Sequence, residues 1–296
     1  MLYNHAIGDG ISGKILLHDV MTFYNDLCQG KCSEPISLPV NPFVGVLNGT
    51  DIIPNDNEDV LMKKITKLNE AYVPSIGMIS SGTHPVRGGF VLQKIENIDE
   101  LVIRAKKEKT TVGMALLAVV YAVTSELENK TPQIDVLVDL RTRLETKDTL
   151  ILNNLVGVMF SIIKTYDVNV EEEFWNCARF IHKQLLLGLE KKEHFEHFHV
   201  LEKLLLAGGA DLKDMCFSNL GCYKYPTQFP ESGVSISSIY LGGNGIVPYV
   251  GGQTLLEIIT VNKSLCFTLV FENCEENRQL ATSMLDSIVK KVQAIF

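Results

Sequence analysis

A histidine and an aspartate lie four residues apart near the start of the chain, in the stretch His5-Ala6-Ile7-Gly8-Asp9-Gly10-Ile11-Ser12-Gly13. On a helix, the side chains of His5 and Asp9 would share one face. The three glycines instead favour a loop that leads into a helix, because glycine gives the backbone beside the histidine conformational freedom. A loop histidine with an ordinary pKa of about 6.5 can accept a proton at neutral pH. His5 is therefore a candidate general base.

The overall composition is that of a globular protein. Of the 296 residues, 46% are apolar and 21% are charged, values that exclude wholesale disorder. The net charge of −8 disfavours nucleic acid as a partner, since nucleic-acid binding needs a basic surface. The longest nearly uninterrupted apolar run, Val112 to Val123, is shorter than the roughly 20 residues that cross a bilayer. We therefore expect no nucleic-acid partner and no membrane span.

The N-terminus and the cysteines favour a cytoplasmic location. The first residues, Met1-Leu2-Tyr3-Asn4-His5, contain neither the basic nor the apolar region of a secretory signal. The seven cysteines are an odd number spread over a long chain, as in proteins that keep their thiols reduced. Cys28 and Cys32 have a CxxxC spacing without the second ligand pair of a zinc site. We therefore expect no metal.

Hydrophobic periodicity predicts a mixture of helices and strands. Helices are expected at about 11–28, 58–72, 99–107, 112–127, 170–189, 195–206 and 275–294. Strands are expected at about 90–95, 134–140, 155–163, 215–218, 234–241, 254–261 and 265–271. The helix at 112–127 is apolar on nearly all sides and should be buried between layers. Asn262-Lys263 should turn the last hairpin. The late antiparallel section favours an α/β sandwich of mixed sheets and helices over a regular parallel sheet.

Four segments in the same order carry a family resemblance. After His-x-x-x-Asp-Gly come TTVGMALLA at 110–118, VDLR at 138–141 with NNLVG at 153–157, and FSNLG at 217–221. Together they resemble the chloramphenicol-acetyltransferase-like superfamily of alcohol acetyltransferases, plant BAHD and polyketide-associated acyltransferases, and nonribosomal-peptide condensation domains. Asn4 stands where condensation domains typically have a second histidine. The resemblance is therefore nearest the alcohol acetyltransferase and polyketide-associated branch.

The resemblance implies an acyltransferase that works at the interface of two subdomains. The family histidine, here His5, takes a proton from an acceptor hydroxyl, amine or thiol, which then attacks a thioester carbonyl. The family aspartate, here Asp9, usually faces away from the substrate and pairs with an arginine that fixes the catalytic loop. Arg141 is the candidate partner, because a guanidinium can hold a carboxylate through two hydrogen bonds. Gly10 belongs to the same loop.

The resemblance also suggests the remaining groups of the reaction. Ser218 or Asn219 is a candidate donor to the oxyanion that forms at the thioester carbonyl. The expected donor is acyl-CoA, as a co-substrate rather than a permanently bound cofactor, and the expected acceptor is a small alcohol or amine. Two alternatives stay open: a non-catalytic binding or scaffold form of the fold, and a condensation domain that depends on a carrier protein.

The position of the histidine predicts how the chain divides. In the family, this histidine follows a substantial N-terminal region, whereas here it is residue 5. We therefore expect residues 1–90 to be the remainder of an incomplete first subdomain, with the HxxxD loop and a linker, and residues 91–296 to be the second subdomain. An incomplete sheet leaves an edge and an apolar face uncovered, so self-association is expected.

Two further clusters have more ordinary interpretations. His194 and His197 would be neighbours on a helix, but no further ligand set is evident, so an exposed helix start is favoured over a metal site. Lys106, Lys107 and Lys109 precede the helix at 112–127 and could hold a cofactor phosphate. A solvated charged surface is the simpler interpretation.

Overall fold

The computed structural model describes residues 8–31, 59–60, 62–63, 66, 88–128, 132–141, 156–159, 170–195, 214–242 and 254–296. His5 and the predicted helix at 195–206, apart from its first residue, lie outside these residues, as does most of the predicted helix at 58–72.

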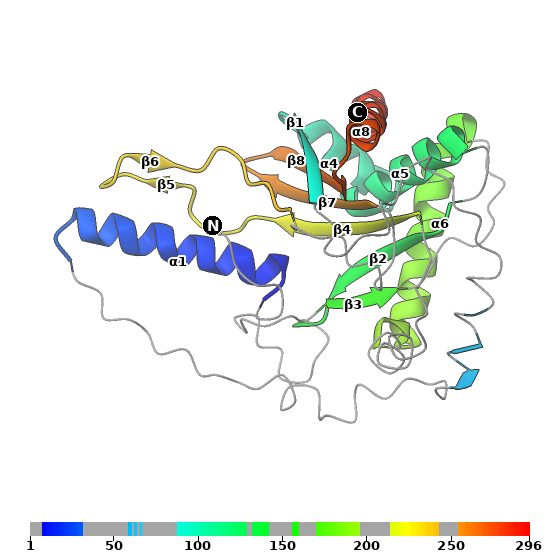
Figure 1. Cartoon of the computed structure of the whole chain (residues 1–296), viewed down its shortest axis with the longest axis horizontal. Helices are drawn as coiled ribbons and strands as arrows, with labels where there is room; N and C mark the ends of the chain where they lie inside the picture. Colours follow the sequence, from blue (N-terminus) through cyan, green and yellow to red (C-terminus); the bar gives the residue numbers. More distant parts are fainter. Residues whose placement is uncertain are drawn as a thin grey trace.

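One mixed sheet forms the centre of the protein, with the strand order β1-β8-β7-β4-β2-β3 (Figure 1). Its strands are β1 (Gly88–Ile95), β2 (Ile134–Asp139), β3 (Val156–Met159), β4 (Met215–Cys222), β7 (Thr254–Val261) and β8 (Ser264–Glu272). The pairs β2–β4 and β4–β7 are parallel, whereas β1–β8, β7–β8 and β2–β3 are antiparallel. A small second sheet pairs β5 (Gln228–Phe229) with β6 (Val234–Ser235). The predicted mixed α/β class is confirmed.

Helices cover the sheet and extend beside it. The described ones are α1 (Gly10–Cys28), α4 (Asp99–Lys107), α5 (Val112–Glu128), α6 (Val170–Glu190) and α8 (Glu275–Ala294), with a 3₁₀ turn η3 (Glu193–Phe195). Figure 1 shows α1 running alongside the β5–β6 arm, away from α5, α6 and α8. No single helix in the described part of the chain is long and apolar enough to cross a membrane, although α4 and α5, bent by 93° at their junction, reach that length and composition together.

The two faces of the sheet have separate apolar cores. On one face, side chains such as Phe217, Leu256 and Leu269 pack with α5 and α8. On the other, Ile259 and Cys266 belong to a smaller core with residues of α1 and the β5–β6 arm. Since successive strand residues point to opposite faces, the register gives the face of each residue of β7 and β8, and of β4 as far as Asn219, where its register with β7 shifts. We call the second of these faces the α1 face.

Several predicted elements are confirmed almost to the residue. Helix α5 is buried along most of its length, and the side chain of Thr111 accepts a hydrogen bond from the Met114 N–H at its N-terminus. Asn262 and Lys263 have positive φ angles of 47° and 65°, as a two-residue hairpin requires. Helix α1 ends in a turn in which Gly30 has φ of 70°.

The predicted strand at 234–241 is wrong beyond Ser235. Strand β6 covers only Val234–Ser235, and the next residues bury apolar side chains without forming a ladder. The N–H of Ile236 donates to the carbonyl of Thr227, and the carbonyl of Ile236 accepts from the side chain of Asn262. These contacts satisfy the backbone locally, so the alternating apolar pattern reflects burial and not pairing.

Candidate functional site

The candidate site begins where the glycine-containing loop becomes a helix. Asp9 is the N-cap of α1 and is fully buried. Its Oδ1 accepts hydrogen bonds from the backbone N–H of Ser12 at 2.9 Å and from the Ser12 hydroxyl at 3.1 Å. An aspartate at this position satisfies one of the free N–H groups at the helix start and stabilises the helix by about 1 kcal/mol. The cap fixes the backbone direction at the end of the HxxxD stretch.

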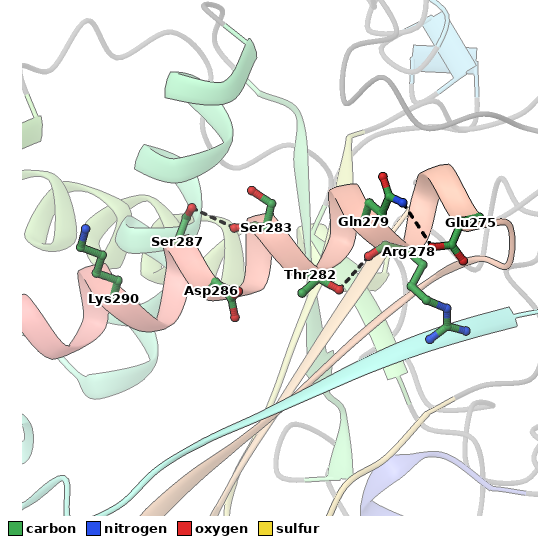
Figure 2. Close-up of a pocket in the computed structure, with 8 residues that line it drawn as sticks. All are labelled: Glu275, Arg278, Gln279, Thr282, Ser283, Asp286, Ser287 and Lys290. Carbon is green, nitrogen blue, oxygen red and sulfur yellow. Dashed lines mark hydrogen bonds between the residues drawn. The ribbon is translucent and has the colours of Figure 1, made fainter.

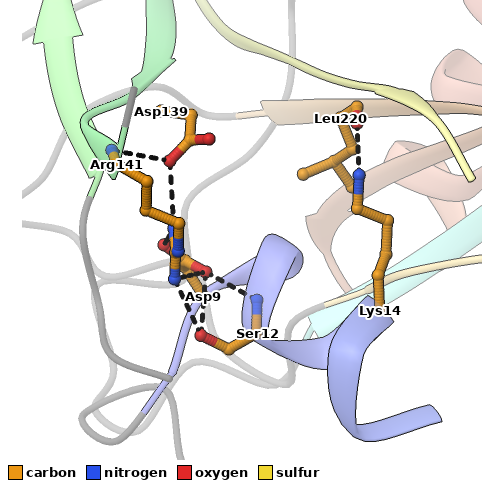
Figure 3. A network of polar contacts seen from close by, with 6 residues as sticks. All are labelled: Asp9, Ser12, Lys14, Asp139, Arg141 and Leu220. Carbon is orange, nitrogen blue, oxygen red and sulfur yellow. Dashed lines mark hydrogen bonds and ion pairs between the residues drawn. The ribbon is translucent and has the colours of Figure 1, made fainter. Parts of the chain in front are cut away.

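Arg141 holds the same carboxylate from the other side (Figure 3). Its Nη1 donates to Asp9 Oδ2 at 2.8 Å and its Nη2 donates to Asp9 Oδ1 at 3.0 Å, while Nη2 also lies 3.0 Å from the Ser12 hydroxyl, which accepts from it. Both charged side chains are 1% exposed. The Asp9–Arg141 pair suggested by the family resemblance is thus present. It joins the start of α1 to Arg141, which follows the end of β2 and lies 132 residues further along the chain than Asp9.

Asp139 completes this network from the last residue of β2. Its Oδ1 accepts from the Arg141 backbone N–H at 3.1 Å and from Nη1 at 3.0 Å. Burial alone lowers the pKa of Arg141, but hydrogen bonds and the charges of Asp9 and Asp139 outweigh it and raise the pKa above its ordinary value. The guanidinium is therefore a permanent cation that compensates a buried anion.

Lys14 ties the first turns of α1 to the central sheet. Its Nζ donates to the carbonyl of Leu220 in β4 at 2.6 Å, and the residue is only 8% exposed (Figure 3). Desolvation lowers its pKa to about 8, against a smaller opposing effect of Asp139. No sequence signal marks Lys14 as part of the site, because its place five residues after Asp9 gives no hint of the β4 carbonyl that it meets.

Gly10 lies at a close contact between α1 and β4. A Cβ at this position would lie 2.7 Å from Cδ2 of Leu220, closer than two carbon atoms can pack. The glycine predicted for the loop therefore has a steric reason in the fold. As a result, the start of α1 lies directly against the strand that carries Ser218 and Asn219.

The two oxyanion candidates lie on different faces of β4. Ser218 is buried and pairs with a residue of the α1 face of β7, while Asn219 is exposed and pairs with Ile258 of the opposite face. The Oδ1 of Asn219 accepts from the N–H of Gly221 at 2.9 Å, and its Nδ2 lies against Gly113 at the start of α5. Ser218 is the candidate on the same face as the start of α1.

His194 and the three lysines considered in the sequence analysis lie outside the candidate site. His194 is 3% exposed and lies against the ring of Phe195, so the expectation of an exposed helix start at this histidine is wrong; its apolar neighbours favour burial. Lys106, Lys107 and Lys109 are exposed, as a solvated surface requires. No group of three or more His, Cys, Asp or Glu side chains within the described ranges is arranged to hold a metal ion.

A shallow hollow follows the outer side of α8, from Glu275 to Lys290 (Figure 2). Three of its side chains bond within the helix: Gln279 donates to Glu275, and Thr282 and Ser287 donate to backbone carbonyls one turn earlier. Asp286 accepts from Gln93 of β1, and Arg278 donates to Asn273 just before the helix. These contacts are typical of a solvated helix surface and do not add to the site at the start of α1.

Comparison with known proteins supports the fold. No family model and no curated protein matches the sequence, but solved structures do. Similar structures include the epimerization domain of tyrocidine synthetase B (TM-score 0.62, 12% identity, 99% of this chain and 67% of that one). They also include the trichothecene 15-O-acetyltransferase of Fusarium sporotrichioides (0.65, 14%, 97% and 64%) and the first condensation domain of the calcium-dependent antibiotic synthetase (0.65, 12%, 97% and 62%).

The chain has the fold of condensation domains and chloramphenicol-acetyltransferase-like acyltransferases. It spans 62 to 67% of the length of these three proteins. The three proteins are named for different reactions (epimerization, acetyl transfer and condensation), so the choice of reaction depends on this chain's own residues.

Proposed function

We propose that the protein transfers an acyl group from a thioester, with acyl-CoA as the donor, to an alcohol or amine acceptor. His5 would act as the general base, four residues before the buried aspartate that begins α1. The observation that supports this most directly is the two-point ion pair between Asp9 and Arg141. The fold that the chain shares with acetyltransferases and condensation domains is a second support.

Within this proposal, Asp9 has a positioning role. Its Oδ1 already accepts three hydrogen bonds and its Oδ2 is engaged by Nη1 of Arg141. A carboxylate so fully occupied is not available to take a proton from a substrate. It instead orients the loop that carries the base, in the way that supporting groups hold a catalytic side chain within tight tolerances.

In the proposed reaction, His5 would remove the proton of the acceptor and Ser218 would stabilise the oxyanion. A neutral alcohol becomes a good nucleophile when a positioned base removes its proton in the transition state, an effect of ~10²–10⁴ in rate. The acceptor oxygen then bonds to the thioester carbon, the carbonyl becomes an oxyanion, and collapse of this intermediate expels the thiolate, which receives the proton held by His5. A hydroxyl donor such as Ser218 would stabilise the oxyanion by a few kcal/mol.

The test is release of free thiol from acetyl-CoA in the presence of a panel of primary alcohols and amines. We expect His5→Ala to lower the acceptor-dependent rate by ~10²-fold or more. His182→Ala, on the distant helix α6, is the matched control and should retain the wild-type rate. A His5→Ala protein with an unchanged rate would contradict the proposal. Saturable binding of acetyl-CoA without turnover by the wild-type protein would favour the non-catalytic alternative.

A further inference from the structure

Three polar side chains lie in one row across the centre of the sheet. Glu257 of β7 is opposite Ser218 of β4 and also opposite Thr268 of β8. Residues opposite each other on neighbouring strands project from the same face, so all three belong to the α1 face. Their flanking residues on that face include Ile259 and Cys266, which are members of an apolar core.

The row is buried and its polar groups are unused. Ser218 is 6% exposed, Thr268 is 2% exposed and Glu257 is partly buried. In the part of the chain that the structure describes, none of the three side chains makes a hydrogen bond or ion pair. Their oxygens are not among the fully buried polar atoms without a partner in the described residues, so they keep some access to solvent. A row of unpaired polar groups with such access, set in an apolar surrounding, can bind a ligand or water. Among the described residues, Glu257 in particular is a carboxyl group without a cation.

The position of the row connects it to the candidate site. Ser218 lies two residues before Leu220, whose side chain contacts Gly10 and whose carbonyl accepts from Lys14. At the other end of the row, a Cβ built at Gly242 would lie 3.6 Å from the methyl group of Thr268. The row therefore runs from beside the start of α1 to the segment that follows the β5–β6 arm.

We propose that Glu257, flanked by Ser218 and Thr268, binds a protonated amine carried by the acceptor substrate. An ammonium group has only donors and an ionised carboxylate has only acceptors, so each satisfies the other. The hydroxyl of Thr268 can accept a further N–H group or donate to an oxygen atom beside the amine, and the hydroxyl of Ser218 stays available to the oxyanion. This site would hold the acceptor through its charge and leave a separate hydroxyl or amine of the same molecule free to receive the acyl group.

The electrostatics of Glu257 agree with a cationic ligand. Desolvation alone raises its pKa to about 7, which means that no described group of the protein compensates its charge. A bound ammonium would restore the ionised form, because an opposite charge within a few ångströms favours ionisation. The net charge of −8 also attracts cationic rather than anionic acceptors over longer distances.

Binding without reaction is the first part of the test. We would titrate a series of primary amines from butylamine to octylamine, and the alcohols of the same length, into the wild-type protein at pH 8 in a calorimeter without thioester. The amine should bind more tightly than the alcohol, and Glu257→Gln should weaken amine binding by about 10-fold or more while leaving the alcohol unchanged. Glu276→Gln, which removes an exposed charge from the first turn of α8, should have no effect.

Two outcomes would overturn the inference: equal binding of amines and alcohols by the wild-type protein, or amine binding that Glu257→Gln leaves intact. The inference rests on the proposed acyl transfer only for its second readout, in which 6-aminohexan-1-ol is compared with hexane-1,6-diol as acceptors for acetyl-CoA. A Glu257-dependent preference for the amino alcohol supports both proposals. Amine binding through Glu257 without any thiol release would retain this inference and contradict the acyl transfer.

Discussion

Asp9 and Arg141 are the residues on which the geometry of the site depends. Each side chain is 1% exposed, and each has the other as its principal charge partner. Removing one member of such a pair leaves a buried charge without compensation, which costs about 3–5 kcal/mol. Arg141→Lys keeps the charge but loses the planar fork that engages both oxygens at once.

We therefore expect Arg141→Met to lower the free energy of unfolding by about 3–5 kcal/mol, and Arg141→Lys to lower it less. Both variants should lower kcat for thiol release more than they change KM, because the pair positions the loop and does not contact substrate. Denaturant unfolding and steady-state kinetics measure the two effects. An Arg141→Lys enzyme with wild-type kcat would show that the loop needs no two-point anchor.

We expect substitution of Glu257 to raise the free energy of unfolding by an amount that depends on pH. Its pKa rises from 4.5 in the unfolded chain to about 7 in the folded protein. Between these two pKa values, the Glu257 carboxyl is ionised in the unfolded chain and still protonated in the folded protein. The free energy of unfolding of the wild type therefore falls as pH rises from 4.5 through 7. Glutamine carries no charge at any pH.

Glu257→Gln should therefore match the wild type near pH 4.5 and exceed its free energy of unfolding by about 1–3 kcal/mol at pH 8. Urea denaturation of both proteins at several pH values gives the difference directly. A difference that does not change with pH would mean that folding leaves the pKa of Glu257 at its unfolded value. A residue that destabilises the folded protein at the centre of a sheet is expected where it binds something.

At the scale of elements, the contact between α1 and β4 decides how the loop is presented. Lys14 is protonated in both the folded and the unfolded chain below pH 8, so the cost of burying its charge is then complete. As pH rises from about 8 to 10.5, the folded form loses its proton while the unfolded form keeps it. The free energy of unfolding contributed by Lys14 therefore increases over this window.

We expect the difference in the free energy of unfolding between wild type and Lys14→Met to shift in favour of the wild type by up to about 3 kcal/mol between pH 7.5 and pH 10.5. Taking the difference between the two proteins cancels the titration of the other lysines and the tyrosines. If the difference in the free energy of unfolding were the same at both pH values, folding would not lower the pKa of Lys14, and its ammonium group would be exposed to water.

The sequence predicts the elements better than it predicts their contacts. Periodicity identifies α1, α5, α8 and the β7–β8 hairpin because burial on one face, or on all faces, leaves a regular pattern. It fails at 236–241, where apolar residues are buried without a strand. The pairing of Asp9 with Arg141 follows from a family resemblance and not from periodicity. Glu257 and Lys14 have no such signal, because their neighbours depend on strand register and on helix docking, which no local pattern encodes.

At the scale of the whole molecule, the fold places the start of α1 and the middle of β4 together, although they are about 200 residues apart in the chain. The described sheet ends at β1, where Phe90 and Leu92 are 54% and 42% exposed. The self-association expected from an uncovered edge stays a prediction. The fold anchors the aspartate end of the HxxxD stretch beside β4, the strand that carries Ser218. The proposed acyl transfer would require such a fixed arrangement of the base and the acceptor.

The most direct test of the central claim is rescue of the His5→Ala protein by imidazole. Thiol release from acetyl-CoA would be followed with an acceptor that the wild-type protein uses, with and without added imidazole. We predict that His5→Ala is inactive alone and regains acceptor-dependent release as imidazole is added, since a free base then replaces the missing one. Full activity of His5→Ala without imidazole would contradict the claim that this histidine is the general base.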